Sequence, residues 1–319
     1  MLSKMRNTLP IIWRQITAPK IPWVPTLTAG EQTKSTWAKI IETYADVPKT
    51  YQDFFAPFFA DGQAFPYTVF TPSRDGFIHK TTEKLICILG HEIYVLEGNE
   101  NTFETQCYPI ERISYIEIKA ILLDSHLKIS GVTKQGVPAS STIKFNSVGD
   151  YLFTPILKII RLAAVDSGDA VQNSELDKFD HLIRLNFKFM NYARRSLLAG
   201  EKVIQFILQP EIRVPIVRFF GKTYYRAISP THISILTNRE LITIREDEPK
   251  NRVVGRYGGI WDYIQLNKIV SLNLIKKDND LLVLSVQLPE GVRLEYLFQA
   301  SAKEELDQLL EQFEKMTTS

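Results

Sequence analysis

Short runs of alternating apolar and polar residues recur along the chain, and this is the pattern of half-buried β-strands. The runs IVSLNLI and LLVLSVQL lie on either side of Asp278-Asn279-Asp280, which favours a hairpin turn. In the first half of the chain, residues 123–126 are expected to form the matching turn. The pattern therefore predicts a mainly β fold built from short strands and hairpins.

Each half ends in a segment whose apolar residues follow a helical period. In the second half we predict a helix from about Ser301 to Met316, with Ser301 as its N-cap and Glu304 as the capping-box partner. The apolar stripe of this helix consists of Leu306, Leu309, Leu310 and Phe313. In the first half Pro155 falls within the corresponding segment, so that helix is expected to begin near the proline.

Three blocks of the first half have counterparts in the same order in the second half. The paired blocks are residues 85–97 and 233–246, residues 109–118 and 265–274, and residues 143–160 and 296–313. Ile88, Ile113 and Phe145 then correspond to Ile235, Ile269 and Phe298. Small differences in spacing between the blocks are of the kind that loops absorb. We interpret the pattern as an internal duplication, against the alternative that two β-rich halves resemble each other by chance.

A helix is expected in front of each unit. Residues 35–44 place Trp37, Ile40, Ile41 and Tyr44 on one side, and residues 179–198 present a broad apolar face. The members of that second face are Phe179, Leu182, Ile183, Leu185 and Met190. Small and polar residues between the units read as a linker. The predicted segments are an arm (1–34), a first domain (35–162), a linker (163–177) and a second domain (178–319).

Composition and charge narrow the class of protein. The 319 residues carry a formal net charge of +2, and such a small charge does not favour nucleic-acid binding. Two cysteines argue against a disulfide scaffold, and no apolar run is long enough to span a bilayer. Residues 1–34 combine a charge of +4 with Trp13 and Trp23, which suits a membrane-surface arm, although an extended or disordered arm is the simpler interpretation.

No familiar catalytic or ligand motif is present. The five histidines lack metal-ligand spacing, and the chain contains no GxGxxG, P-loop or GxSxG sequence. We therefore expect no enzymatic activity, no cofactor and no metal site. An enzyme with dispersed residues remains a third hypothesis, which a deep pocket holding groups of shifted pKa would favour.

Charge distinguishes the two halves. Residues 184–226 contain nine basic and two acidic residues, whereas residues 35–79 carry a charge of −2. Within the basic stretch, VRFFGKTYYRA places cationic residues around Phe219, Phe220, Tyr224 and Tyr225. Basic and aromatic side chains together suit an anionic interface. The alternative is that the aromatic residues belong to the core and the charges are merely solvated.

The order of strands followed by one closing helix resembles the pleckstrin-homology-like superfold, in particular its bacterial PH and GRAM-like branch. The features that carry the resemblance are the TNRELITI hairpin, the strands PIERISYIEI and QLNKIVSLNL, and the closing helix. The resemblance covers about residues 46–161 and 200–316. The first unit departs from it, with Gly90-His91 in place of the turn and a proline in its helix.

The resemblance implies an α+β, mainly β protein with two domains, each a bent sheet or open barrel with a leading helix and a C-terminal capping helix. It also implies that an early hairpin of the second domain would bind an anionic headgroup. The candidate ligands are Arg213, Arg218, Lys222, Tyr224 and Arg226.

Our first functional hypothesis is a non-enzymatic protein that binds a protein or peptide partner, with homo-oligomers as a further possibility, because an open sheet edge can accept a strand. The alternative is binding to an anionic membrane surface or lipid headgroup through the basic hairpin. Either hypothesis places the protein in the cytoplasm, at the membrane periphery in the second case.

Overall fold

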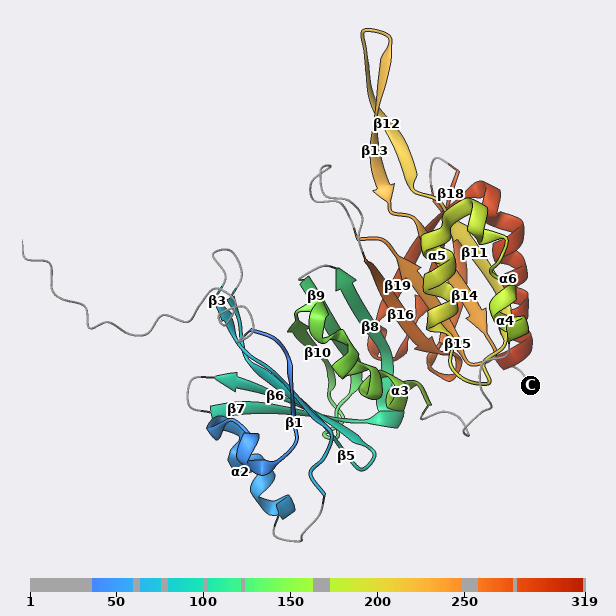
Figure 1. The fold of residues 1–319 in the computed structure, drawn as a ribbon. Coiled ribbons are helices and arrows are strands. Elements are labelled where there is room, and N and C mark those ends of the chain that lie inside the picture. Colours follow the sequence, from blue (N-terminus) through green and yellow to red (C-terminus); the bar gives the residue numbers. More distant parts are fainter. Residues whose placement is uncertain are drawn as a thin grey trace, which may run out of the picture. The chain divides into compact units, whose positions relative to one another are not determined.

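The computed structural model describes most of the chain after residue 35 (Figure 1). The described residues are 36–59, 64–75, 80–99, 102–121, 124–162, 173–247, 258–277 and 280–317. Their fold is mainly β, with several antiparallel sheets of which none is closed. The predicted mainly β class is thus confirmed. The predicted arm 1–34 and residues 163–172 of the predicted linker lie outside the described residues.

The first half begins with a five-stranded antiparallel sheet in the order β1-β2-β5-β6-β7. Its strands are β1 (Lys39–Ile41), β2 (Thr68–Thr71), β5 (Lys84–Leu89), β6 (Glu92–Asn99) and β7 (Thr102–Pro109). Along the chain, a short pair of strands, β3 (Arg74–Asp75) and β4 (Lys80–Thr81), comes between β2 and β5. Helix α2 (Lys49–Phe59) buries Tyr51 and Phe55 completely in an apolar cluster with β5 and β6.

After β7 the chain turns through a 3-10 segment (Ile110–Arg112) and forms three more strands and a helix. These elements are β8 (Ile113–Ile121), β9 (Asp124–Val132), β10 (Pro138–Phe145), a 3-10 segment (Ser147–Phe153) and α3 (Thr154–Leu162). Phe145 and Phe153 stack with ring centroids 4.1 Å apart in the core. Pro155 is the second residue of α3, where its missing N–H breaks no helical hydrogen bond, as predicted.

The second half repeats this order. Helices α4 (Asn173–Asp177) and α5 (Leu182–Ser196) precede the strands, and α6 (Lys303–Thr317) closes the chain. The strands are β11 (Val203–Gln209), β12 (Ile212–Phe219), β13 (Lys222–Ser229), β14 (His232–Thr237), β15 (Glu240–Arg245), β16 (Gly259–Gln265), β17 (Ser271–Lys277), β18 (Leu281–Gln287) and β19 (Arg293–Gln299). Leu306, Leu309 and Phe313 of α6 are buried against this half, as the predicted stripe requires.

One sheet runs through both halves. Strand β8 pairs with β9 on one side and with β16 on the other, which creates the order β10-β9-β8-β16-β15-β14-β11. Strands β17, β18 and β19 form a separate three-stranded sheet. The contacts place all the described residues in a single compact unit.

The blocks paired in the sequence fall on elements at the same place in each half. Residues 85–97 form the hairpin β5–β6 and residues 233–246 the hairpin β14–β15. Likewise, β8 and β17 each follow a 3-10 segment, and β10 and β19 each lead through a 3-10 segment into a closing helix. Counted this way, β7 corresponds to β16 and β8 to β17, and a small additional hairpin follows β2 in one half and β11 in the other.

The predicted helix over residues 35–44 is wrong. Lys39–Ile41 pairs instead with β2, and Ile41 is buried between the sheet and α2. Thr43 and Asp46 then form a reciprocal capping pair around a short 3-10 segment, Tyr44–Asp46. The β-branched pair Ile40-Ile41 favours a strand at this position. Among the described residues, the first helix of this half with α-helical turns is α2, which follows β1 and precedes β2.

The second leading helix is present but its predicted apolar face is only partly correct. Asn186 has non-helical backbone angles, and its side chain accepts a hydrogen bond from the Phe189 N–H at 3.3 Å. Asn186 thus acts as a cap inside α5 and rotates the first turn away from the stripe. Ile183 and Leu185 are consequently exposed, whereas Phe179, Leu182 and Met190 are buried. The last five residues of the predicted linker form the short helix α4. Ser301 lies within a 3-10 segment before α6, so its predicted role as the N-cap is wrong.

Candidate functional site: a projecting hairpin and the cavity at its base

The hairpin β12–β13 carries all five residues predicted from the sequence. Along the chain it lies between β11 and β14, which pair with each other. It forms a two-stranded sheet of its own and projects beyond the rest of the second half (Figure 1). Its turn consists of Phe220 and Gly221, with φ of 45° and 73°. A two-residue turn of this kind needs positive φ at both positions, and glycine adopts such values without strain. The local sequence therefore defines the tip of the hairpin.

Pairing in the hairpin separates the predicted site residues onto two faces. Residues directly opposite each other lie on the same face of an antiparallel pair, and the faces alternate along each strand. Phe219 pairs with Lys222 and Val217 with Tyr224, so these side chains share one face with Arg226. The other face carries Arg213, Arg218 and Tyr225. The five predicted residues thus do not converge on a single headgroup pocket.

The hairpin leaves its large apolar side chains in solvent. Phe220 is 91% exposed and Phe219 is 60% exposed, and their rings meet edge to face at 4.5 Å. Ile216, Val217, Tyr224 and Tyr225 are also each at least half exposed. The alternative that these aromatic residues belong to the core is therefore wrong. An exposed apolar surface of this kind marks an interaction site more often than scattered single residues do.

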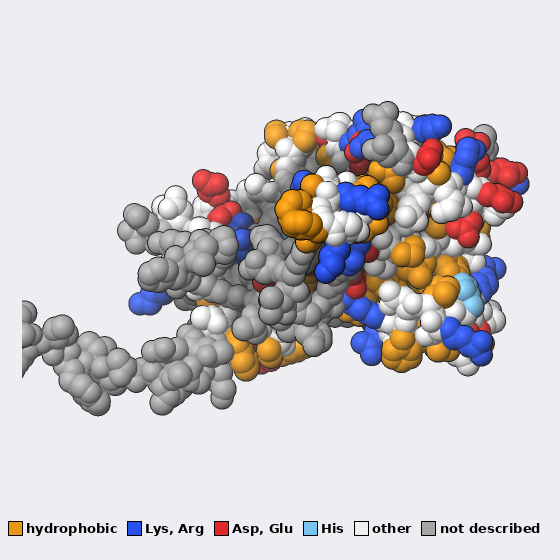
Figure 2. Space-filling view, turned by 90° about the horizontal axis from the view of Figure 1, so that it is seen from above, with side chains coloured by type: hydrophobic (Ala, Val, Ile, Leu, Met, Phe, Trp, Pro, Cys, Tyr) orange, Lys and Arg blue, Asp and Glu red, His pale blue; other side chains and the backbone are white. Residues whose placement is uncertain are grey.

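Positive charge accompanies this apolar surface. Residues 212–229 contain four basic residues and no aspartate or glutamate. Arg213 pairs with Glu211 at 2.5 Å, whereas Arg218, Lys222 and Arg226 form no ion pair with any carboxylate in the described parts of the chain. Figure 2 looks onto the molecule from above and shows basic and hydrophobic side chains next to each other on this side. The hairpin is thus a cationic and aromatic arm.

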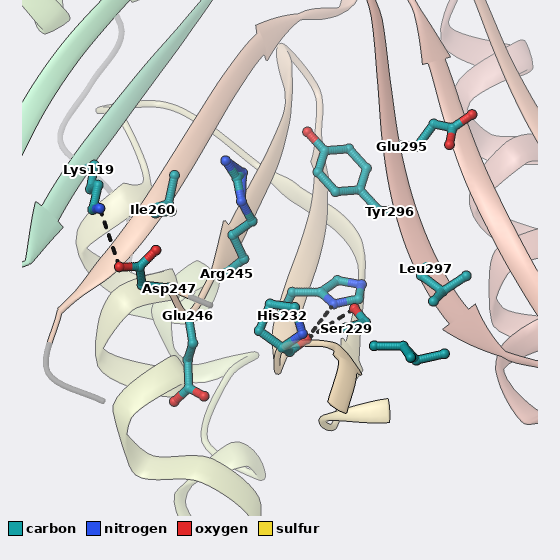
Figure 3. Close-up of a pocket in the computed structure, with 12 residues that line it drawn as sticks. Lys119, Ser229, His232, Arg245, Glu246, Asp247, Ile260, Glu295, Tyr296 and Leu297 are labelled. Atoms are coloured by element: carbon teal, nitrogen blue, oxygen red, sulfur yellow. Dashed lines mark hydrogen bonds and ion pairs between the residues drawn. The ribbon is translucent and has the colours of Figure 1, made fainter. Parts of the chain in front are cut away.

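A cavity of about 560 Å³ lies at the base of the hairpin (Figure 3). Ser229 and Pro230 line it where β13 ends, together with His232, Arg245, Tyr296 and, from the first half, Lys119. The His232 Nδ1 lies 3.2 Å from the Pro230 carbonyl oxygen, so Nδ1 carries the proton. The Nε2 atom is then an acceptor, and it is buried without a hydrogen-bond partner among the described residues. Burial lowers the pKa of His232 to about 4.

The side chain of Arg245 leads from this cavity into a buried charge network, the Arg245 network. Its guanidinium donates to Asp262 Oδ2 at 2.7 Å and to Glu117 Oε2 at 2.6 Å. Tyr296 donates its hydroxyl hydrogen to the same Asp262 oxygen at 3.1 Å, and the His126 Nε2 lies 2.7 Å from Glu117 Oε1. Asp262 and Glu117 stand opposite each other in the β16–β8 pair, so the arginine neutralises two facing carboxylates.

The two carboxyl groups respond differently to this environment. Burial raises the pKa of Asp262 to about 6, and the attraction of Arg245 offsets only part of that effect. Burial also acts to raise the pKa of Glu117, but the hydrogen bond with His126 and the charge of Arg245 outweigh it and hold the pKa at about 2. Burial raises the pKa of the Tyr296 hydroxyl well above its usual range.

A second buried network connects the halves through α3. Arg161 donates to Glu240 Oε2 at 2.6 and 2.9 Å and to the Ser196 carbonyl oxygen at 2.8 Å, and its guanidinium lies 3.9 Å from the centre of the Tyr263 ring. Glu201 approaches the same guanidinium at 3.8 Å. Sequence reasoning missed both networks, because no local motif marks residues that meet only when distant elements of the chain pack together.

The cavity contains shifted-pKa groups, as an enzyme with dispersed residues would require, but the arrangement offers no nucleophile held by a base. The Ser229 hydroxyl donates to the Pro230 carbonyl oxygen at 3.3 Å, the same oxygen that the His232 Nδ1 faces, and not to a His232 ring nitrogen. The Lys119 ammonium is paired with Asp124 at 3.0 Å and Asp247 at 3.3 Å. Among the described residues, no cluster of three histidine, cysteine or acidic side chains is arranged to hold a metal ion.

No helix within the described parts of the chain has both the length and the apolar character needed to cross a membrane. No known family model matches the chain, and no curated protein matches it.

Proposed function

We propose that the protein is a non-enzymatic binding protein with two PH-like modules, and that the hairpin β12–β13 binds an anionic membrane surface. The observation that carries the proposal is the exposed tip Phe219-Phe220, flanked by Arg218 and Lys222 on a hairpin without acidic residues. Aromatic side chains insert into the headgroup region of a bilayer, while nearby cations are attracted to anionic lipids. Because the basic residues lie on both faces, the hairpin fits a surface better than a single headgroup.

Vesicle co-sedimentation tests this proposal. Each basic residue near an anionic membrane contributes about 1 kcal/mol, so reversing two charges in the variant Arg218→Glu/Lys222→Glu should weaken binding by at least about tenfold. The matched control is Lys144→Glu/Lys158→Glu, which makes the same change in net charge at exposed positions of β10 and α3. Binding should also decrease as salt concentration rises.

Two results would contradict the membrane proposal. One is the absence of binding to anionic vesicles at low salt. The other is an equal loss of binding in the hairpin variant and in the Lys144→Glu/Lys158→Glu control, which would make the effect one of net charge alone.

A second candidate function is the binding of a protein strand at the edge of β17. This strand pairs with β18 on one side only, among the strands that the structure describes. Asn273, Ile275, Lys276 and Lys277 are exposed along it. An unpaired edge presents backbone donors and acceptors that an extended segment can satisfy, as in β-strand addition.

A further inference from the structure

The junction between the halves is an asymmetric strand pairing. Strand β8 is the fifth strand of the first half when β2, β5, β6 and β7 are counted as the first four, and β16 is the fourth strand of the second half. Tyr263 to Gly259 pairs antiparallel with Ile116 to Ala120. The fifth strand of the first half is thus paired with the fourth strand of the second half.

This pairing leaves the complementary edges without a strand partner among the described residues. The fourth strand of the first half is β7, which pairs only with β6 among the described strands, and the fifth strand of the second half is β17, which pairs only with β18. The exposed part of β7 is its N-terminal half, where Thr102, Glu104 and Thr105 are exposed. At Cys107 the carbonyl oxygen accepts a hydrogen bond from the Lys134 N–H at 2.8 Å, so the free edge ends at Gln106. The corresponding part of β16 is the part that pairs with β8.

We infer that β17 of one copy pairs antiparallel with β7 of a second copy and so repeats, between chains, the β8–β16 junction within the chain. The partner at the β17 edge is therefore a second copy of this protein. The inference rests on the second candidate function and is independent of membrane binding by the hairpin.

The register of the proposed contact follows from the junction. Matching Ile110 to Leu266 places Gln106 at the position of Asp262, and matching Ile113 to Ile269 places Asn273 at the position of Glu117. The two facing carboxylates of the junction, which need Arg245 between them, thus become two facing amides. Gln106 Oε1 already accepts from the hydroxyls of Tyr108 and Ser141, and Asn273 Nδ2 donates to Ser271 Oγ. The Gln106 Nε2 donor and the Asn273 Oδ1 acceptor are therefore the groups that can pair, without a counter-ion. With amides at these two positions, the contact between copies avoids the repulsion between carboxylates that would arise there without Arg245.

Other residues of β7 and β17 that would face each other in this register are also compatible with strand pairing. Glu104 of the second copy would face Ile275, with Lys277 as its diagonal neighbour on the same face. Opposite charges at such positions stabilise strand pairs, and a long lysine side chain spans the diagonal. Phe103 would face Lys276, whose aliphatic chain can cover the ring. No pair of like charges arises in the four positions of the contact.

Strand pairing of this kind is heterologous and does not close a dimer. Each copy has one β17 edge and one β7 edge, so a second contact adds a third copy, and assemblies grow into chains or rings. Self-association should therefore pass beyond two copies as concentration rises. An isologous contact, in which β17 pairs with β17, would stop at a dimer.

Sedimentation velocity of the full chain over a concentration series provides the first test. Since a four-residue strand contact is small, the weight-average mass should increase up to roughly 100 μM and exceed that of two copies. Ile275→Glu should return the protein towards the monomer, because the new carboxylate would face Glu104 of the second copy. The matched control is Ile183→Glu, at an exposed isoleucine of α5, which should leave the mass unchanged.

Mixed cross-linking tests the polarity of the contact. Glu104→Cys and Ile275→Cys proteins, oxidised as a mixture, should give a disulfide-linked species that neither variant gives alone. A monomer throughout the concentration series overturns the inference, and so does cross-linking in the Ile275→Cys protein alone. Vesicle binding by the hairpin is measured separately, so failure of either test can be told from failure of the other.

Discussion

Charged and aromatic side chains are buried and paired at the junction between the halves, whereas on the hairpin β12–β13 they are exposed. At the junction Arg161 and Arg245 are satisfied by carboxylates and aromatic rings within the fold. On the hairpin, Arg218 and Lys222 have no carboxylate partner among the described residues, and Phe220 is almost fully exposed. A buried cation is held by the fold that surrounds it, whereas an exposed cation beside an exposed ring has no folding role. The difference separates residues that maintain the structure from residues available for binding.

The largest expected effect is at the junction. Arg161→Met leaves Glu240 buried next to Glu201 without their shared cation, and breaking a buried ion pair in this way costs about 3–5 kcal/mol. Urea unfolding of the variant should show this loss in the free energy of unfolding. Arg195→Met, at an exposed arginine of α5, is the matched control and should change it by no more than about 0.5 kcal/mol. A loss below about 1 kcal/mol for Arg161→Met would mean that the network does not hold the halves together.

A somewhat smaller effect is expected in the dependence of stability on pH. The raised pKa of Asp262 means that the native state holds a proton which the unfolded state releases, so stability falls as pH rises from about 4 to about 6. The lowered pKa of His232 has the opposite sign, since the unfolded state binds a proton that the native state excludes, and stability rises between about pH 4 and 6.5. The low pKa of Glu117 adds a contribution that rises with pH only below about pH 4.5, and the raised pKa of the buried Glu201 adds one that falls above that pH.

The two opposing slopes can be separated by substitution. Asp262→Asn removes the contribution that falls with pH, so from about pH 4.5 to 6 its stability should rise by about 2 kcal/mol relative to that of the wild-type protein, at ~1.4 kcal/mol per pH unit for one group. His232→Asn removes the contribution that rises with pH, so its stability should fall relative to that of the wild-type protein over the same range. Urea unfolding at several pH values measures both. Parallel pH profiles for the wild-type protein and the two variants would refute the assignment.

The smallest effect on stability is expected at the hairpin. Phe219→Ser/Phe220→Ser removes two rings that are mostly in solvent, and surface substitutions of this kind change the free energy of unfolding by about 0.5 kcal/mol or less. The same variant should lose most of its binding to anionic vesicles. Thermal unfolding and vesicle co-sedimentation of one preparation compare the two. A large loss of stability would show that the rings have a structural role and would remove the contrast with the junction.

The sequence predicted elements whose pattern is local. The apolar stripe of α6 and the hairpin β14–β15 follow from the spacing of a few residues. The predicted helix over 35–44 failed because pairing with β2 determines β1, and the apolar face of α5 failed in part because Asn186 caps the helix internally.

The candidate site was predicted only in part for the same reason. The basic and aromatic hairpin was recognised from residues adjacent in sequence, although the separation of Arg218 from Lys222 and Arg226 onto opposite faces required the observed pairing. Glu117, Arg245 and Asp262 meet only because β8 and β16 pair, and no local pattern indicates that contact. Long-range strand pairing is thus the information that the sequence alone did not supply.

The most direct test of membrane binding is the depth of the hairpin tip in a bilayer. In Phe220→Trp, the added tryptophan should be quenched by brominated lipid in anionic vesicles, relative to the wild-type protein, whose own tryptophans serve as the background. Quenching that appears only with anionic vesicles and decreases with salt would support insertion of the tip. Vesicle binding without any additional quenching of the Phe220→Trp protein would contradict it.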